Sequence, residues 1–378
     1  MKNCHLRILI ALWMLTALAA CVQSYIPPAI HANNNYLVVD GFLNSGPDST
    51  VITLSRAQNL SASNVFVPEL HAQVSVLSGN LISIPITEQG NGIYWSSGLN
   101  LNYNQQYLLK IITSDGKEYL SDSVTPKLTP PIDSVYWQQI NSGVNIDLDT
   151  HDPQNNTRYY LWNFTETWQD ETFFTSSLQF DASGQLVPRP PANQVHTCWA
   201  TLNSTNVLTA TTSTLEQDIV SKQPITQVPA NSEQIFILFS ILVRQYAISR
   251  QAFQYWQNLI TSTEQLGILF GPQPTQVTGN IHCVSNPAEP VLGYLSARSQ
   301  SEARIFINRY QLGLWLMPTP PCYPILLNQS QLAQAFSDSV LTIFISEAGP
   351  GKWVFSSPSC SDCRYDHGGV TTKPSFWP

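Results

Sequence analysis

The stretch PPIDSVYWQQINSGVNIDLDTHDPQNNTRYYLWNFTETW, residues 130–168, decides the fold class of this chain. In its first half, Val144, Ile146 and Leu148 are separated by polar residues, which is the period of a half-buried β-strand. Residues 152–156 (DPQNN) have the composition of a turn. The pattern therefore predicts β-structure that begins directly after the two prolines.

Aromatic residues dominate the part of this stretch that follows the turn. Tyr160, Trp162, Phe164 and Trp168 recur on one face of a second strand. We expect the two strands to form a β-hairpin, because a turn of this kind joins two alternating runs. Its heavy aromatic face would nucleate the second of two domains.

The composition indicates an extracytoplasmic all-β protein with many loops. Only 11% of the 378 residues are charged, against about 25% in average globular domains, and 26 are proline. A chain of this length has room for two or three domains. The net charge of −8 argues against nucleic-acid binding, which needs a basic surface.

The N-terminus has the features of a bacterial lipoprotein signal. Lys2 and Arg7 precede an apolar run over residues 8–18, and Leu18-Ala-Ala-Cys21 resembles the lipobox. In that resemblance residues 1–20 are removed and Cys21 receives the lipid. An ordinary signal peptide with a nearby cysteine is the alternative. The apolar run is too short for a membrane span, which takes about 20 residues.

The mature chain divides into a tether and two predicted domains. Residues 21–35 form a polar, proline-containing tether, and they lack an acidic cluster that would indicate one face of the outer membrane. Residues 36–129 contain short strands at about ten-residue spacing, which predicts an immunoglobulin- or transthyretin-like β-sandwich. This first domain contains no cysteine.

Residues 130–378 are expected to form a fibronectin-like sandwich with a helical insertion and a cysteine-rich tail. The period changes after Ser249, where Ala252, Trp256 and Ile260 lie at four-residue steps. Ser249 is the expected N-cap of this helix. The predicted architecture is therefore mainly β, with two tandem β-sandwich domains.

An ordered set of motifs resembles a known family. They are the lipobox, Leu37-Val-Val-Asp-Gly41, Pro131-Ile-Asp-Ser-Val135, Tyr159 to Trp168, Tyr255-Trp256, Gly279-Asn-Ile281, Gly293-Tyr294, and the tail from Cys360-Ser-Asp-Cys-Arg364 to Trp377. Together these motifs look like the Bacteroidota lipoproteins known as domain of unknown function 4249, over nearly the whole mature chain. The resemblance implies an outer-membrane lipoprotein, often encoded beside a TonB-dependent receptor, and it implies no reaction.

Five cysteines remain after removal of Cys4 and lipidation of Cys21. Cys198, Cys322, Cys360 and Cys363 are the disulfide candidates, because an oxidising envelope favours disulfides over a redox or metal role. The preferred pairing joins Cys360 to Cys363 and Cys198 to Cys322. It leaves Cys283 as the odd thiol, although sequence alone does not establish connectivity.

No catalytic motif is present, and we expect neither an enzyme nor a cofactor. None of the seven histidines lies in a hydrolase or metalloprotease motif. Glu166 lies on the aromatic face, but a glycosidase needs a second carboxylate. We expect Glu166 to pair with Arg158 or Arg244 instead.

Three aspartates lie close together in the sequence but do not predict a metal site. Asp147 and Asp149 fall on the polar face of the strand, and Asp152 falls in the turn. Calcium binding is the alternative interpretation of this group. We favour a solvated strand face.

The aromatic residues offer a ligand-stacking hypothesis. Trp162, Trp168, Tyr255 and Trp256 are the candidates, although such residues are more often core residues in β-sandwiches. We therefore expect a non-enzymatic lipoprotein of the outer membrane that captures a ligand for, or otherwise assists, a TonB-dependent transporter. The alternatives are a structural or assembly component of an envelope complex and an envelope hydrolase.

Overall fold

The structure is a computed structural model that describes residues 35–58, 66–79, 82–264, 277–316, 322–332, 343–365 and 367–378. The predicted signal segment, Cys21 and nearly all of the tether lie outside these residues. No helix among the described residues is long and apolar enough to cross a membrane.

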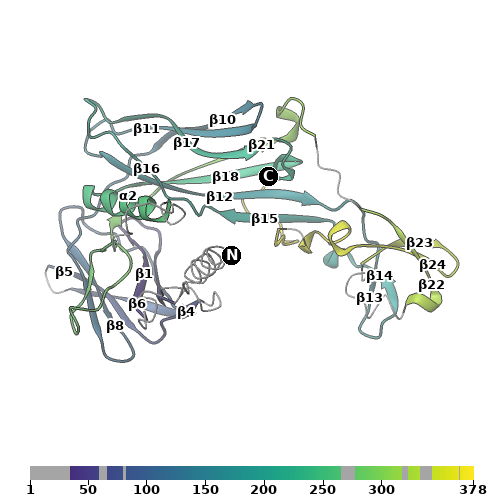
Figure 1. The fold of residues 1–378 in the computed structure, drawn as a ribbon, viewed down its shortest axis with the longest axis horizontal. Helices are drawn as coiled ribbons and strands as arrows, with labels where there is room; N and C mark the ends of the chain where they lie inside the picture. The colour runs from purple at the N-terminus through teal and green to yellow at the C-terminus, as the bar shows by residue number, and fades with distance from the viewer. Residues whose placement is uncertain are drawn as a thin grey trace, which may run out of the picture.

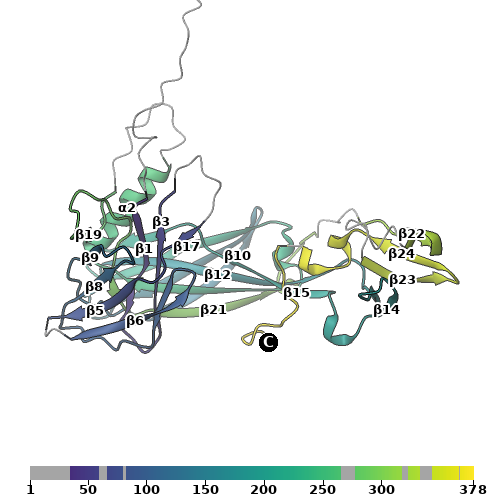
Figure 2. The ribbon, with the colours of Figure 1, turned by 90° about the horizontal axis from the view of Figure 1, so that it is seen from below.

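The chain is mainly β, and its antiparallel sheets form three units (Figure 1). We call them the base unit, which contains β1 to β9, the central unit, which contains β10 to β12, and the distal unit, which contains β22 to β24. The base unit lies against one end of the long central strands and the distal unit lies beyond their other end (Figure 2). Helix α2 (Arg250–Glu264) lies between the base and central units.

The base unit is a curled sheet with the strand order β1-β3-β7-β6-β5-β8-β9-β19, and β4 pairs with β3. Alternate side chains of these strands, such as Ile52 and Leu109, are fully buried and form one core. The strands are β1 (Leu37–Gly41), β3 (Thr50–Arg56), β4 (Val67–Pro68), β5 (Gln73–Ser78), β6 (Ser83–Gly90), β7 (Ile93–Ser96), β8 (Tyr107–Ile112), β9 (Glu118–Ser121) and β19 (Ile281–Cys283).

A segment from much later in the chain completes the base unit. Strand β19 pairs with β9, and β20 (Ala297–Arg298) pairs in parallel with β2 (Leu43–Asn44). Val291 and Leu295 are buried in the base core. We expected residues 130–378 to form the second domain by themselves, but residues 281–297 pack in the first unit, because apolar strand residues there fill its open edge.

The central unit consists of two sheets packed face to face. One sheet contains β10 (Ile132–Ile140), β11 (Gly143–His151) and β17 (Ile219–Pro229). The other contains β15 (Thr197–Asn203), β12 (Tyr159–Glu171), β18 (Leu238–Ala247), β21 (Ser301–Asn308) and β16 (Leu208–Thr211), which pairs with β12. Val144, Ile146 and Leu148 are buried in the core between the sheets, as their alternation predicts.

The predicted pairing of the two strands around the 152–156 turn is wrong. Strand β11 forms its hairpin with β10, through the short turn at residues 141–142, and also pairs with β17. Strand β12 pairs with β15, β16 and β18 in the opposite sheet. The chain crosses from one sheet to the other at this turn, because the buried faces of β11 and β12 pack against each other. Two strands that are hydrogen-bonded neighbours in one sheet cannot pack face to face in this way.

The distal unit is a small lobe around Leu327 and Phe355. Its strands are β13 (Leu178–Phe180), β14 (Leu186–Pro188), β22 (Ile325–Asn328), β23 (Ile343–Gly349) and β24 (Lys352–Ser356). The 3₁₀ helices among the described residues are η2 (Pro191–Asn193), η3 (Glu233–Ile235), η5 (Arg309–Gln311), η6 (Gln329–Gln331), η7 (Pro358–Cys360) and η8 (Cys363–Tyr365). The C-terminal tail returns to the central unit, where Trp377 lies against Phe306 with ring centroids 5.7 Å apart.

All four candidate cysteines form disulfides, but the preferred pairing is wrong. Cys198 of β15 is bonded to Cys363, and Cys322 is bonded to Cys360. The Cys363 amide donates to the Val195 carbonyl, which places this cysteine beside β15, whereas Cys360 lies one 3₁₀ turn earlier. Cys283 is a free, buried thiol in β19, as expected.

This connectivity predicts a specific peptide map. Digestion of the unreduced protein with a protease that cleaves before Asp362, between the two tail cysteines, should release one linked pair that contains Cys198 with Cys363 and another that contains Cys322 with Cys360. Mass spectrometry before and after reduction measures this directly. A linked peptide that contains only residues 360 and 363 would contradict the structure.

Candidate functional site: a pocket between the base and central units

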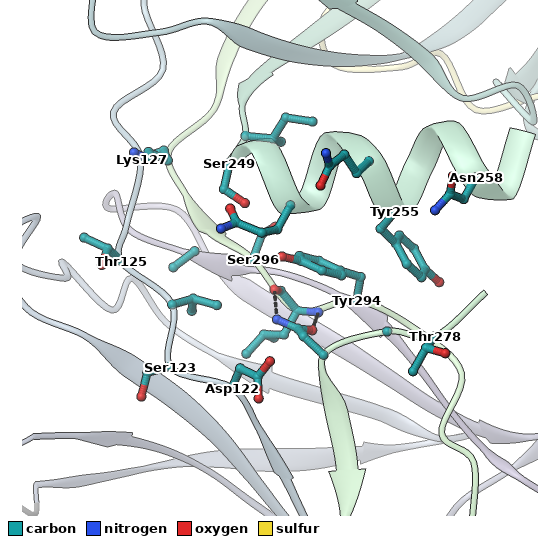
Figure 3. Close-up of a pocket in the computed structure, with 18 residues that line it drawn as sticks. Asp122, Ser123, Thr125, Lys127, Ser249, Tyr255, Asn258, Thr278, Tyr294 and Ser296 are labelled. Carbon is teal, nitrogen blue, oxygen red and sulfur yellow. Dashed lines mark hydrogen bonds between the residues drawn. The ribbon is translucent and has the colours of Figure 1, made fainter. Parts of the chain in front are cut away.

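Helix α2 has two different faces. Ala252 is buried, and Phe253 lies against Tyr159 of β12 with ring centroids 5.2 Å apart. The Ser249 hydroxyl accepts a hydrogen bond from the Ala252 amide at 3.1 Å, which makes Ser249 the N-cap, as predicted. The apolar face therefore fixes α2 to the central unit, and the other face is turned toward the base unit (Figure 3).

A cavity of about 590 Å³, which we call the junction pocket, lies below this second face. Its residues come from α2, from the segment after β9 and from residues 278–297 (Figure 3). They are Asp122, Ser123, Val124, Thr125, Lys127, Ile248, Ser249, Gln251, Gln254, Tyr255, Asn258, Thr278, Gly279, Asn280, Tyr294, Leu295, Ser296 and Ala297.

Two glycines and an asparagine build the floor of the junction pocket. A Cβ atom on Gly279 would lie 1.7 Å from the carbonyl oxygen of Gly293, so only glycine allows this approach. The side-chain Nδ2 of Asn280 donates to the Leu295 backbone carbonyl at 3.0 Å, and the side-chain Oδ1 of Asn280 accepts from the Leu295 backbone amide at 2.8 Å (Figure 3). Asn280 is buried, and the paired bonds hold the two passes of chain together.

Two tyrosines, Tyr255 and Tyr294, line the junction pocket next to this floor. The rings of Tyr255 and Tyr294 have centroids 5.1 Å apart and are tilted by 35°. Burial raises the pKa of both side chains above the ordinary tyrosine value, while hydrogen bonds with the Gly293 backbone and Ser249, respectively, act in the opposite direction. Both phenols therefore remain protonated and neutral at physiological pH.

A buried arginine fastens the two units beside the pocket. The Arg298 guanidinium lies between the rings of Phe42 and Tyr246, 4.4 and 4.3 Å from their centroids. Burial lowers its pKa to about 10, so it remains a cation. Its Nε and Nη1 have no hydrogen-bond partner among the described residues, and the aromatic faces supply the compensating interaction. Phe42 belongs to the base side and Tyr246 to the central unit, which makes this contact a clamp.

The ligand-stacking candidates separate into core and pocket residues. Trp162 and Trp168 are 0% and 4% exposed in the central core, so neither presents a ring face to a ligand. Trp256 packs on the central side of α2, and Tyr255 lines the junction pocket. The expectation of stacking at Trp162 and Trp168 is therefore wrong, because the inward face of β12 fills the space between two sheets.

Glu166 is buried, and it does not pair with an arginine. Its Oε2 accepts from the Gln234 amide at 3.4 Å, whereas Arg244 contacts Glu302 at 2.9 Å and Arg158 donates to backbone carbonyls. Burial raises the pKa of Glu166, and the hydrogen bonds from Gln234 and Thr226 oppose this. Because both arginines have other partners, the predicted ion pair between Glu166 and Arg158 or Arg244 is wrong.

The burial of the Glu166 carboxylate predicts that the stability of the fold depends on pH. The pKa of Glu166 in the folded state lies above the ordinary value of 4.5, so between these two values the folded state binds more protons than the unfolded state. The free energy of unfolding therefore decreases as the pH rises through this range. Glu166→Gln should therefore raise the free energy of unfolding at about pH 7.5, with little effect near pH 4. Urea unfolding at both pH values measures this.

The matched control is Glu302→Gln, because Glu302 is exposed and pairs with Arg244. This change should leave stability nearly unchanged or lower it slightly. A Glu166→Gln variant that is less stable than the parent at pH 7.5 would show that the charge is stabilised, contrary to our interpretation.

Two of the three aspartates, Asp149 and Asp152, accept hydrogen bonds from backbone amides. The Asp152 carboxylate accepts amide hydrogen bonds from Gln154, Asn156 and Thr157, and Asp149 accepts one from Lys222. Within the described ranges, no group of three or more His, Cys, Asp or Glu side chains is arranged to hold a metal ion.

Most of the pocket residues were not predicted from the sequence. Gln251, Gln254 and Asn258 form a carboxamide stripe at three- and four-residue spacing on α2. That stripe is readable from the sequence once the helix is predicted, and it marks the face that does not pack on the central unit. The opposite wall has no such signal, because Ser123 and Ser296 come together only through the return of residues 281–297 to the base unit.

Fold and site define a mainly β protein of antiparallel sheets with a polar pocket where two units meet. The family model described as "Domain of unknown function (DUF4249)" matches residues 23–304, and the chain belongs to this family. No curated protein matches the chain. Among solved structures, a chitinase, ChiA74 from Bacillus thuringiensis, aligns at 15% identity with a TM-score of 0.14. The alignment covers 50% of this chain and 27% of the chitinase, and a score this low carries no information about activity.

Proposed function

We propose that this chain is a non-enzymatic outer-membrane lipoprotein that captures a ligand in the junction pocket and presents it to a TonB-dependent transporter. The observation that carries the proposal is the pocket itself. Its volume of about 590 Å³ lies within the range of small-molecule sites, roughly 300–1,000 Å³. Hydrogen-bonding side chains and the rings of Tyr255 and Tyr294 line it.

Membrane attachment is supported by the N-terminal sequence. Leu18-Ala-Ala-Cys21 has the lipobox pattern, and lipid on Cys21 would anchor the mature chain without a membrane-spanning helix. Residues 21–35 would then connect the lipid to the base unit with a reach of at most about 50 Å.

We also propose a finer description of the fold. The base unit would be immunoglobulin- or transthyretin-like, and the central unit would be fibronectin-like with α2 as an insertion.

Detergent purification of the tagged, lipidated chain from native outer membranes tests the proposal. Mass spectrometry should find a TonB-dependent receptor in stoichiometric amount, and Cys21→Ala should leave the membrane fraction. A lipoprotein that is recovered without any receptor would contradict the partnership.

A role in assembly is the second candidate, and exposed apolar side chains favour it. Leu314 and Leu316 are 81% and 59% exposed near the β10–β11 turn. Their loop is held in place, because Trp315 donates to the Ser232 carbonyl at 2.9 Å. If assembly is the main role, Leu314→Glu should abolish function in cells and variants of the junction pocket should not.

A further inference from the structure

The helical wall of the junction pocket carries a row of neutral carboxamide side chains. Gln251, Gln254 and Asn258 are exposed, and their carboxamides make no hydrogen bond with the described part of the chain. A carboxamide offers donors and an acceptor side by side. A ligand that carries neighbouring groups able both to donate and to accept would match this stripe.

The facing wall offers hydroxyl groups of the same neutral character. Ser123, Thr125 and Ser296 line the pocket from the base side (Figure 3). Tyr255 adds a ring that is half-buried at the contact with Tyr294, and its protonated hydroxyl carries no charge. The lining therefore combines a flat apolar surface with many uncharged hydrogen-bonding groups.

The two charged residues of the pocket have opposite signs. Asp122 is paired with His282, with Oδ1 and Nε2 3.1 Å apart. Lys127 is exposed, and its backbone is bound to residues 297–299. The pocket thus has no cluster of charge that would select an ionic ligand.

Three main-chain amides beside the pocket are already paired within the chain. The Asp122 amide donates to the Asn280 carbonyl at 2.7 Å, the Leu295 amide donates to Asn280 Oδ1, and the Lys127 amide donates to the Ala297 carbonyl at 2.9 Å. Extended peptides bind sheets mainly through such main-chain groups. Since these are already paired, recognition falls to the side chains.

We infer that the junction pocket binds a neutral oligosaccharide. Sugar hydroxyls donate and accept at once, which suits the carboxamide stripe, and the C–H face of a sugar ring packs on a tyrosine ring. This inference rests on the proposed ligand-capture function and names its ligand class.

Isothermal titration calorimetry of the full mature chain tests the inference. The probes are a panel of neutral tri- to pentasaccharides of glucose, mannose, galactose, xylose and N-acetylglucosamine, together with a galacturonic acid trimer and an uncharged capped tripeptide. At least one neutral sugar should bind. Tyr255→Ala and Gln254→Ala should each weaken that binding tenfold or more, whereas Tyr310→Ala, a matched change at a 94% exposed tyrosine, should not.

Three results would overturn the inference: no neutral sugar binds, only the peptide binds, or the galacturonic acid trimer binds best and Lys127→Ala abolishes its binding. Circular dichroism spectra of the variants must match the parent. The sugar result is separable from the proposed function. A receptor that co-purifies with a chain that binds only peptide removes the ligand class alone, whereas sugar binding without a receptor removes the partnership alone.

Discussion

Gly279→Ala should lower the free energy of unfolding by about 3 kcal/mol or more, in the upper range for single substitutions. The reason is steric, because the added Cβ would lie 1.7 Å from the Gly293 carbonyl oxygen and both groups are backbone. The Gly293 backbone has little room to move away, since a Cβ atom built on Gly293 would itself lie 2.0 Å from the Val39 carbonyl oxygen of β1. The variant should therefore separate residues 277–297 from the base unit.

Urea unfolding followed by circular dichroism measures this effect. Gly79→Ala is the matched control, because a Cβ there meets nothing within 4 Å, and it should change stability by less than about 1 kcal/mol. Ligand binding by Gly279→Ala should fall as well, since Gly279 forms the pocket floor. Equal stabilities of the two variants would contradict the close approach of the two chain passes.

Trp162→Ala should lower the free energy of unfolding of the central unit by about 3 to 5 kcal/mol. Trp162 is fully buried and stacks on Tyr160 with ring centroids 5.5 Å apart. Its indole N–H donates to Gln245 Oε1 at 2.9 Å, and the Gln245 amide donates to Thr150 and to the Pro130 carbonyl. The substitution leaves a cavity between the sheets and an acceptor without its donor, and both effects destabilise the fold.

Differential scanning calorimetry is suited to this test because the base and central units have separate cores. Trp95→Ala is the matched control, since Trp95 is 41% exposed on β7. It should shift the transition by far less. A Trp162→Ala protein that melts with the parent would show that the ring does not fill the core.

Local patterns predicted strands and the helix well. The alternation at Val144, Ile146 and Leu148 is confirmed by their burial, and Ser249 caps α2 as its side chain and position indicate. These features depend on neighbouring residues, so the sequence carries them directly. The same local reasoning could not place Trp162, because a strand with an aromatic face looks alike whether that face meets a ligand or a second sheet.

Long-range features were beyond such reasoning. Cys360 and Cys363 are three residues apart, yet they bond to cysteines 38 and 165 residues away, because the tail passes between the distal and central units. Similarly, β19 pairs with β9 across some 160 residues, which joins residues 278–297 to the segment after β9 and creates the junction pocket. The spacing of residues along the chain does not indicate which sheet edges are left to pair with a distant segment.

Native mass spectrometry tests most directly whether the junction pocket is where this protein holds its ligand. The mature chain and a Gln254→Trp variant, whose indole would fill the space beside Tyr255, are incubated with the small-molecule fraction of spent growth medium from native cells. We predict a bound mass on the parent chain and none on the variant. No bound mass on the parent, or the same mass at equal occupancy on both, would contradict ligand capture at this pocket.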